Sequence, residues 1–72
     1  MKNRIKQYRA AKDFTQEDLA KRAGCSRQTI NSMEKSKYTP SLSLAFLIAD
    51  ILEVDINELF IREQKEGGDN ND

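Results

Sequence analysis

The chain has 72 residues, of which 38% are hydrophobic and 33% charged, as expected of one small globular domain whose single core is only marginally stabilising. It contains no histidine and one cysteine, which excludes an intramolecular disulfide, a zinc-type ligand cluster and a Ser/His or Cys/His nucleophile pair, so we expect no enzyme, metal site or cofactor. No apolar stretch approaches the length of a membrane span and the N-terminus lacks the apolar core of a signal peptide, which predicts a cytoplasmic protein with no membrane partner.

The charged residues are unevenly distributed along the chain, although the formal net charge is zero. Residues 1–41 carry ten basic and four acidic groups, a net charge of +6, whereas residues 42–72 carry two basic and eight acidic groups, a net charge of −6. A basic half and an acidic half suit a polyanionic partner that approaches from one side. The alternative interpretation is that these charged side chains are solvated at the surface and bind no polyanion.

Two helices are predicted in the first 24 residues. The first spans residues 2–12 and places Ile5 and Tyr8 on a narrow apolar stripe. The second follows the N-cap Thr15 and has acidic residues in its first turn, where they complement the helix dipole. Gly24 ends it, because a left-handed residue after the last turn is tolerated best without a Cβ atom. Its inward-facing residues are expected to be Leu19, Ala20 and Ala23.

A third helix is predicted to begin after the N-cap Ser26 and to reach about residue 35. Ile30 and Met33 are its two core-facing residues, and the remainder of its surface is polar. Residues 36–40 are expected to form a loop. Two short helices joined by a tight Gly turn, with the second polar on its outer side, are typical of a helix-turn-helix.

The polar side of this third helix suits the reading of base edges in DNA. A helix in the major groove buries one narrow stripe in its own protein and presents hydrogen-bond donors and acceptors on the rest. Arginine suits guanine O6 and N7, and glutamine or asparagine suits adenine N6 and N7. The alternative interpretation is that the third helix is a solvated surface helix that reads no DNA. The predicted base-reading residues are Arg27, Gln28, Asn31 and Ser32.

A more apolar fourth helix is predicted over residues 42–52, after the N-cap Ser41. Its core stripe is expected to consist of Leu42, Ala45, Phe46, Ala49 and Leu52. A second apolar stripe then remains on the same helix, formed by Leu44, Leu47 and Ile51. Asp55 caps a short fifth helix, which Ile56, Leu59 and Phe60 anchor to the core. Residues 61–63 are candidates for a short edge strand. The domain is expected to comprise residues 1–62. Residues 63–72 have no apolar side chain and are expected to form a flexible acidic tail.

Several linked motifs run along the chain: FTQEDLA at residues 14–20, AGCSRQTIN at 23–31, PSL at 40–42, and Ile56 followed by Leu59-Phe60. On these residues, the sequence resembles the Cro/CI-type (XRE) helix-turn-helix regulators, and within them small stand-alone members similar to the cytolysin-operon repressor type. The resemblance covers residues 3–62. It implies an all-α, five-helix, lambda-repressor-like domain whose second and third helices form the helix-turn-helix. It also implies that the third helix docks in the major groove, usually in a two-fold dimer on an inverted repeat.

The resemblance also implies roles for residues around the third helix. Arg9 and Glu34 match positions that commonly form a structural ion pair between the first and third helices. Cys25 stands where the family usually has a small apolar residue, which implies packing in the turn, with a redox switch as the alternative. Ser36 replaces the more usual Gly or Asn. For Asn31, the resemblance leaves a phosphate contact open as the alternative to a base contact. The residues implied to contact phosphates are Gln16, Ser26, Thr29, Lys35, Lys37, Tyr38 and Ser41.

The second apolar stripe of the fourth helix predicts a homodimer, because a contiguous exposed apolar surface usually marks an interface. Coverage of this stripe by the fifth helix and the tail is the alternative. The predicted interface residues are Leu44, Leu47, Ile51, Ile56 and Phe60. The leading hypothesis is therefore a sequence-specific repressor of transcription that binds an inverted-repeat operator, with no small-molecule effector evident. The second hypothesis is an antitoxin or adaptor that holds a protein partner on the same stripe.

Overall fold

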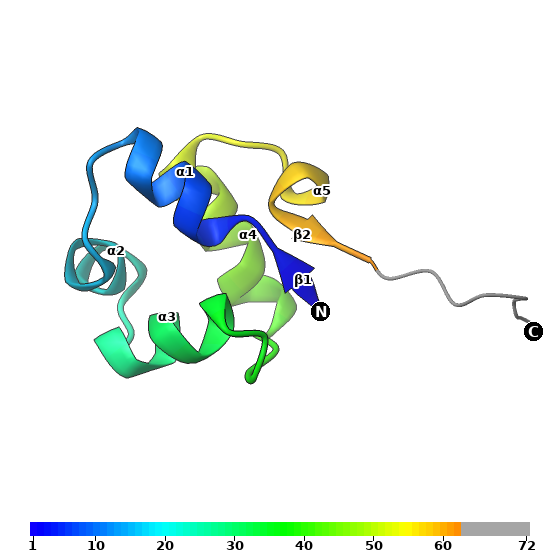
Figure 1. Cartoon of the computed structure of the whole chain (residues 1–72), viewed down its shortest axis with the longest axis horizontal. Helices are drawn as coiled ribbons and strands as arrows, with labels where there is room; N and C mark the ends of the chain where they lie inside the picture. The colour runs from blue at the N-terminus through cyan, green and yellow to red at the C-terminus, as the bar shows by residue number, and fades with distance from the viewer. Residues whose placement is uncertain (63–72) are drawn as a thin grey trace, which may run out of the picture.

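The computed structural model describes residues 1–62, which form five α-helices and a two-stranded β-ribbon (Figure 1). The predicted five-helix fold is confirmed. The elements are β1 (Lys2–Asn3), α1 (Ile5–Ala11), α2 (Gln16–Ala23), α3 (Arg27–Glu34), α4 (Leu42–Leu52), α5 (Ile56–Leu59) and β2 (Phe60–Ile61). The tail predicted for residues 63–72 lies outside the described residues. Within residues 1–62, no helix is long and apolar enough to cross a membrane, and no acidic or thiol cluster is arranged to hold a metal ion.

The N-terminal segment is a strand where the sequence predicted the start of a helix. Residues 2 and 3 pair antiparallel with β2, so that Lys2 lies opposite Ile61 and Asn3 opposite Phe60. The side chain of Asn3 accepts the Ile5 backbone N–H at 3.2 Å, which explains why the helix begins at Ile5. The predicted edge strand at residues 61–63 is shifted to Phe60–Ile61, and Phe60 therefore belongs to β2 and not to the last helix.

Four of the five helices begin with the predicted N-caps. Thr15 Oγ1 accepts the Asp18 backbone N–H at 3.0 Å, and the Asp18 carboxylate accepts the Thr15 backbone N–H at 2.9 Å, which completes a capping box. The hydrogen bond that the Asp18 carboxylate accepts from the Thr15 backbone lowers the pKa of Asp18 below its usual value, and hydrogen bonding by the Thr15 side chain to the carboxyl group lowers it further. The other three caps are Ser26, Ser41 and Asp55.

Helices α1 to α4 share one type of C-terminal ending, a residue with a left-handed backbone. At the end of α3, Ser36 N–H donates to Met33 O at 2.9 Å and Lys37 N–H donates to Ser32 O at 2.8 Å. This paired arrangement satisfies carbonyls that the helix leaves free. The left-handed residues are Asp13, Gly24, Ser36 and Glu53, with φ of 59°, 71°, 60° and 59°.

Replacing Gly24 by alanine is expected to lower the free energy of unfolding by about 1–2 kcal/mol. The loss comes from the φ of 71°, since no heavy atom beyond the chain neighbours lies within 4 Å of the added Cβ atom. Urea denaturation of the two proteins measures the difference. Gly24→Asn is the matched control and should lose less, because asparagine tolerates the left-handed region better. Equal losses for the two variants would contradict a backbone origin.

Helix α4 buries a different face from the one predicted. The predicted core stripe included Leu42 and Phe46, which is wrong, because these side chains are 69% and 50% exposed. Ile48, placed in neither predicted stripe, is fully buried. Apolar residues lie almost all around this helix, so its sequence singles out no face, and packing against the other helices selects one. The buried residues of α4 are Ala45, Ile48, Ala49 and Leu52.

The predicted dimer stripe is also largely occupied within the chain. Leu44 and Ile51 of this stripe are half-buried and pack against the core of their own chain, so the stripe is less exposed than was predicted. The predicted interface residues Ile56 and Phe60 are half-buried in the same way. Leu47, the remaining member, is 41% exposed. The exposed apolar surface of α4 consists instead of Leu42, Phe46 and Leu47, which we call the apolar patch. It borders a groove of about 510 Å³ lined in part by Leu42, Phe46, Ile56 and Phe60.

Candidate nucleic-acid interface

Helices α2 and α3 pack against each other across the turn at residues 24–26, and α3 lies at one side of the molecule (Figure 1). The left-handed Gly24 allows Cys25 N–H to donate to Ala20 O at 3.0 Å, which reverses the chain before α3 begins. The half-buried Cys25 packs against the core, in line with the packing role implied for it. Burial raises the pKa of its thiol, so the group stays protonated at neutral pH.

Helix α3 has a narrow buried stripe and a broad polar surface. Its buried residues are Ile30 and Met33, as predicted. Because residues four apart lie on the same side of a helix, the polar residues on the other sides form two rows, Arg27 with Asn31 and Gln28 with Ser32. All four predicted base-reading residues reach the surface: Arg27 and Gln28 are exposed, and Asn31 and Ser32 are half-buried.

The row of Gln28 and Ser32 borders a hollow of about 400 Å³ between α3 and the loop that follows it. The structure therefore brings two predicted base-reading residues together with four of the predicted phosphate contacts. The other three, Gln16, Lys35 and Ser41, do not line this hollow. The lining residues are Ser26, Gln28, Thr29, Ser32, Lys37 and Tyr38.

Some of the predicted phosphate contacts also have structural partners within the chain. Ser26 Oγ accepts the Thr29 backbone N–H at 3.1 Å and lies 2.9 Å from Thr29 Oγ1. Ser41 Oγ accepts the Leu44 backbone N–H at 3.2 Å. A hydroxyl that accepts in this way still has its own hydrogen to donate, so capping is compatible with a phosphate contact.

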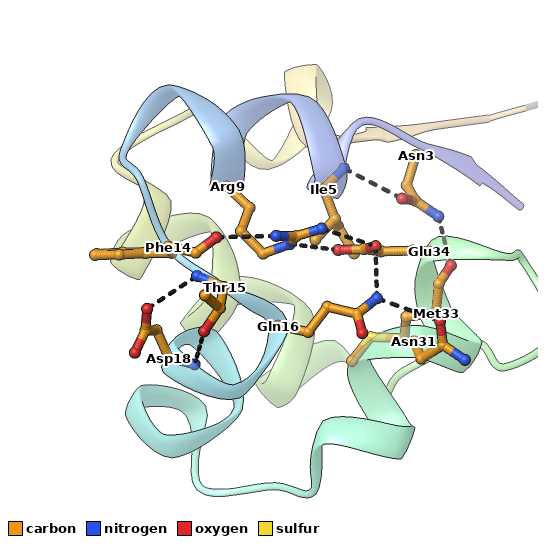
Figure 2. A network of polar contacts seen from close by, with 10 residues as sticks. All are labelled: Asn3, Ile5, Arg9, Phe14, Thr15, Gln16, Asp18, Asn31, Met33 and Glu34. Atoms are coloured by element: carbon orange, nitrogen blue, oxygen red, sulfur yellow. Dashed lines mark hydrogen bonds and ion pairs between the residues drawn. The ribbon is translucent and has the colours of Figure 1, made fainter.

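A part-buried polar network joins the end of α3 to α1 (Figure 2). Arg9 Nε donates to Glu34 Oε2 at 2.8 Å and Arg9 Nη2 to Glu34 Oε1 at 3.3 Å, with side chains only 14% and 8% exposed. Arg9 Nη1 donates in addition to the Phe14 carbonyl at 2.9 Å. The ion pair implied for Arg9 and Glu34 is therefore present. It holds the last turn of α3 against α1 and against the loop before α2.

The side chain of Gln16 joins the same network, which the sequence did not predict. Its Nε2 donates to Glu34 Oε1 at 3.0 Å and to Asn31 Oδ1 at 3.2 Å (Figure 2). Both hydrogens of this amide group are thus directed at side chains of α3, although the resemblance implied a phosphate contact for this residue. No local sequence signal marks these contacts, because the partners lie 15 and 18 residues away along the chain.

The N-terminal segment is also bonded to the end of α3, a second connection that the sequence did not predict. Asn3 Nδ2 donates to the Met33 carbonyl at 2.7 Å, and Ser36 Oγ donates to the Met1 carbonyl at 2.8 Å. These bonds span 30 and 35 residues of sequence. Together with the Arg9–Glu34 pair, they fix the position of α3 from its C-terminal end.

Comparison with sequence families gives one match over most of the chain. The model described as helix-turn-helix matches residues 5–59. An uncharacterized HTH-type transcriptional regulator of Methanocaldococcus jannaschii is 58% identical over 66 residues, which cover 92% of this chain and 100% of that protein. A second one, from Archaeoglobus fulgidus, is 48% identical over 66 residues, covering 92% of this chain and 93% of that protein.

Solved structures with similar folds include two regulators. The restriction-modification controller protein C.AhdI from Aeromonas hydrophila superposes with a TM-score of 0.73 at 32% identity, covering 79% of this chain and 86% of that chain. SinR, described as a master regulator for biofilm formation and solved in complex with DNA, gives a TM-score of 0.69 at 31% identity. That match covers 75% of this chain and 87% of the SinR chain.

Proposed function

Because the chain belongs to the Cro/CI-type (XRE) helix-turn-helix family of DNA-binding transcriptional regulators, we propose that it is a repressor that binds an inverted-repeat operator as a homodimer, with α3 in the major groove. The observation that carries this proposal is the polar surface of α3. Its buried side consists of Ile30 and Met33, and its other sides present amide, guanidinium and hydroxyl groups to solvent. We propose the cytoplasm as its site of action, as the sequence predicted.

The two rows of α3 supply the contacts that specify sequence. The exposed Arg27 guanidinium matches the paired acceptors of a guanine, and Gln28 and Asn31 match an adenine. Each good bidentate pair contributes about 1–3 kcal/mol of discrimination against the wrong base. Ser32, beside Gln28 at the hollow, donates or accepts a single hydrogen bond.

Phosphate contacts on both sides of the groove set the register of α3 without specifying sequence. On one side lies the hollow, lined by Ser26, Thr29, Lys37 and Tyr38. The two other proposed contacts, Lys35 and Ser41, are exposed at the end of α3 and at the start of α4. On the other side lies the N-terminus of α2, where the first backbone N–H groups lack helical partners and favour an anion. The phosphate contact of Gln16 then comes from its backbone N–H.

The apolar patch is the proposed dimer surface. Leu42, Phe46 and Leu47 are exposed on one helix, and the adjoining groove contains Ile56 and Phe60. A second copy that packs on this surface would bury it in both chains through one two-fold axis. The two α3 helices would then enter successive major grooves about 34 Å apart, which explains the inverted repeat. Repression follows where such an operator overlaps a promoter.

Fluorescence anisotropy on duplexes selected from a random pool, compared with scrambled DNA, tests the proposal. We expect at least about a thousandfold preference for the selected duplex and a steep loss of affinity with salt. Arg27→Ala should lose discrimination at one base pair of each half-site, by about 1–3 kcal/mol. Lys35→Ala is the control and should weaken binding about equally on all sequences, with a smaller salt dependence.

Weak binding that ignores sequence would overturn the proposal. In that case, the basic half of the chain would be a general polyanion surface, and the apolar patch would point to an antitoxin or adaptor with a protein partner. Sedimentation of the free protein then separates the two functions, because an adaptor without its partner has no need to form a homodimer. The dimer itself is tested by the Leu47 variant considered in the Discussion.

A further inference from the structure

The network around Gln16 has a fixed hydrogen-bond polarity, which begins at Arg9. The Arg9 guanidinium donates to both oxygens of Glu34, and an ionised carboxylate only accepts hydrogen bonds. The group that Gln16 directs at Glu34 Oε1, 3.0 Å away, must therefore be its NH₂ and not its carbonyl oxygen. The orientation of the Gln16 amide follows from the charge of its neighbour.

The same polarity continues from Gln16 to Asn31. The second hydrogen of Gln16 Nε2 points at Asn31 at a distance of 3.2 Å. Only the Asn31 carbonyl oxygen can accept it, so Asn31 Oδ1 faces α2 and Asn31 Nδ2 faces away from it (Figure 2). An asparagine on an open helix surface exchanges these two groups freely, whereas here the exchange would set two NH₂ groups against each other.

We propose that Gln16 is a positioning residue for sequence recognition. Through the Gln16 side chain, the Arg9–Glu34 ion pair fixes the orientation of the Asn31 amide group, and this orientation determines which base Asn31 recognises. This inference rests on the proposed function. Asn31 Nδ2 has no hydrogen-bond partner within residues 1–62 and can donate to a base edge, and Oδ1 keeps one lone pair beside the bond from Gln16. An adenine matches this arrangement, because its N7 accepts and its N6 amino group donates.

The proposal differs from a phosphate contact by the Gln16 side chain in what it predicts for base preference. A lost phosphate contact weakens binding to every sequence by a similar factor. Loss of a positioning contact instead lets Asn31 turn its amide over, so that an acceptor and a donor on the base become nearly equivalent. The base pair that Asn31 reads then loses its preference, and the other base pairs of the half-site keep theirs.

The test measures the affinity of four proteins for the selected duplex and for every single base-pair variant of one half-site. The proteins are the wild type, Gln16→Ala, Asn31→Ala and the double variant. We expect Asn31→Ala to flatten the preference at one base pair, and Gln16→Ala to reduce the preference at the same pair by about tenfold. The double variant should match Asn31→Ala, since Gln16 acts through Asn31. Gln16→Met keeps the packing volume of the side chain but removes its hydrogen bonds. It should reduce the preference as Gln16→Ala does, which separates the lost hydrogen bonds from any loss of stability in Gln16→Ala.

A uniform loss on all duplexes for Gln16→Ala, adding to the loss of Asn31→Ala, would overturn the positioning role and assign the side chain to a phosphate. An unchanged base preference in Asn31→Ala would also overturn it. In both results, a base preference that still depends on Arg27 would leave the proposed function intact. Absence of any selected sequence for the wild type would instead overturn both.

The free protein offers a second readout that does not depend on DNA. The side-chain amide signals of Asn31 and Gln16 in a ¹⁵N NMR spectrum report their hydrogen bonds directly. We expect Gln16→Ala to shift the Asn31 Nδ2 signals and Asn31→Ala to shift the Gln16 Nε2 signals, while backbone signals of the core stay in place. Unchanged side-chain signals in both variants would overturn the proposal.

Discussion

Glu34→Ala is expected to lower the free energy of unfolding by about 3 kcal/mol, the lower end of the range for a buried ion pair that loses one partner, because this pair is part-buried. The variant leaves the Arg9 guanidinium, only 14% exposed, without its carboxylate and removes an acceptor from Gln16. A single core in a chain of this length rarely supplies more than about 3–5 kcal/mol, so we expect much of the protein to be unfolded. Thermal unfolding followed by circular dichroism measures the effect.

The matched control replaces both partners of the ion pair. In the double variant Arg9→Met with Glu34→Leu, no charge is left unpaired, and we expect it to be more stable than Glu34→Ala alone. Glu53→Ala serves as the comparison for an exposed pair. The Lys12 Nζ to Glu53 Oε1 distance is 3.2 Å but the Glu53 side chain is 75% exposed, so its loss should cost less than about 1 kcal/mol. A similar small loss for Glu34→Ala would show that the Arg9–Glu34 pair behaves as a surface pair.

Leu47→Glu is expected to convert the proposed homodimer into a monomer and to lower the affinity for the proposed inverted-repeat operator by at least about a hundredfold. The substitution places a charge in the apolar patch, between two copies that would otherwise exclude water there. A monomer also loses the gain in affinity from holding two half-sites at once. Analytical ultracentrifugation at micromolar concentration gives the oligomeric state, and anisotropy on the full and half operators gives the affinities.

Ala10→Glu is the control for this variant, because it makes the same apolar-to-acidic change at an exposed position of α1, outside the apolar patch. It should remain a dimer with nearly unchanged affinity for the operator. A wild-type protein that sediments as a monomer, and whose state does not change with Leu47→Glu, would contradict the dimer hypothesis. The apolar patch would then have to serve a different partner.

The features that the sequence predicted well depend on contacts between near neighbours in the chain. Ser26, for example, accepts a backbone N–H three residues ahead. At the end of α2, Gly24 N–H donates to Lys21 O and Cys25 N–H donates to Ala20 O. Such contacts form within one turn and are specified by residue type. The linked motifs were long enough to assign the family, which the comparisons confirm. The base and phosphate contacts, which need the DNA, stay predictions.

The features that the sequence missed depend on how the elements pack together. On the apolar fourth helix, Phe46 and Ile48 are equally good core residues by type, and only contact with the other helices puts Ile48 inside. The strand pairing of Asn3 with Phe60 joins residues far apart in the chain, where a helix over residues 2–12 satisfied the local pattern equally well.

The sequence by itself therefore determined the helix-turn-helix, its caps and the polar surface of α3, because each of these follows from interactions within a few residues. The tertiary structure alone decided which side of α4 is exposed and which partners Gln16 has. Those outcomes depend on a competition among side chains that lie 15 or more residues apart, as for the bond from Gln16 to Asn31. Packing density and unpaired polar groups decide such a competition, and both are properties of the assembled core.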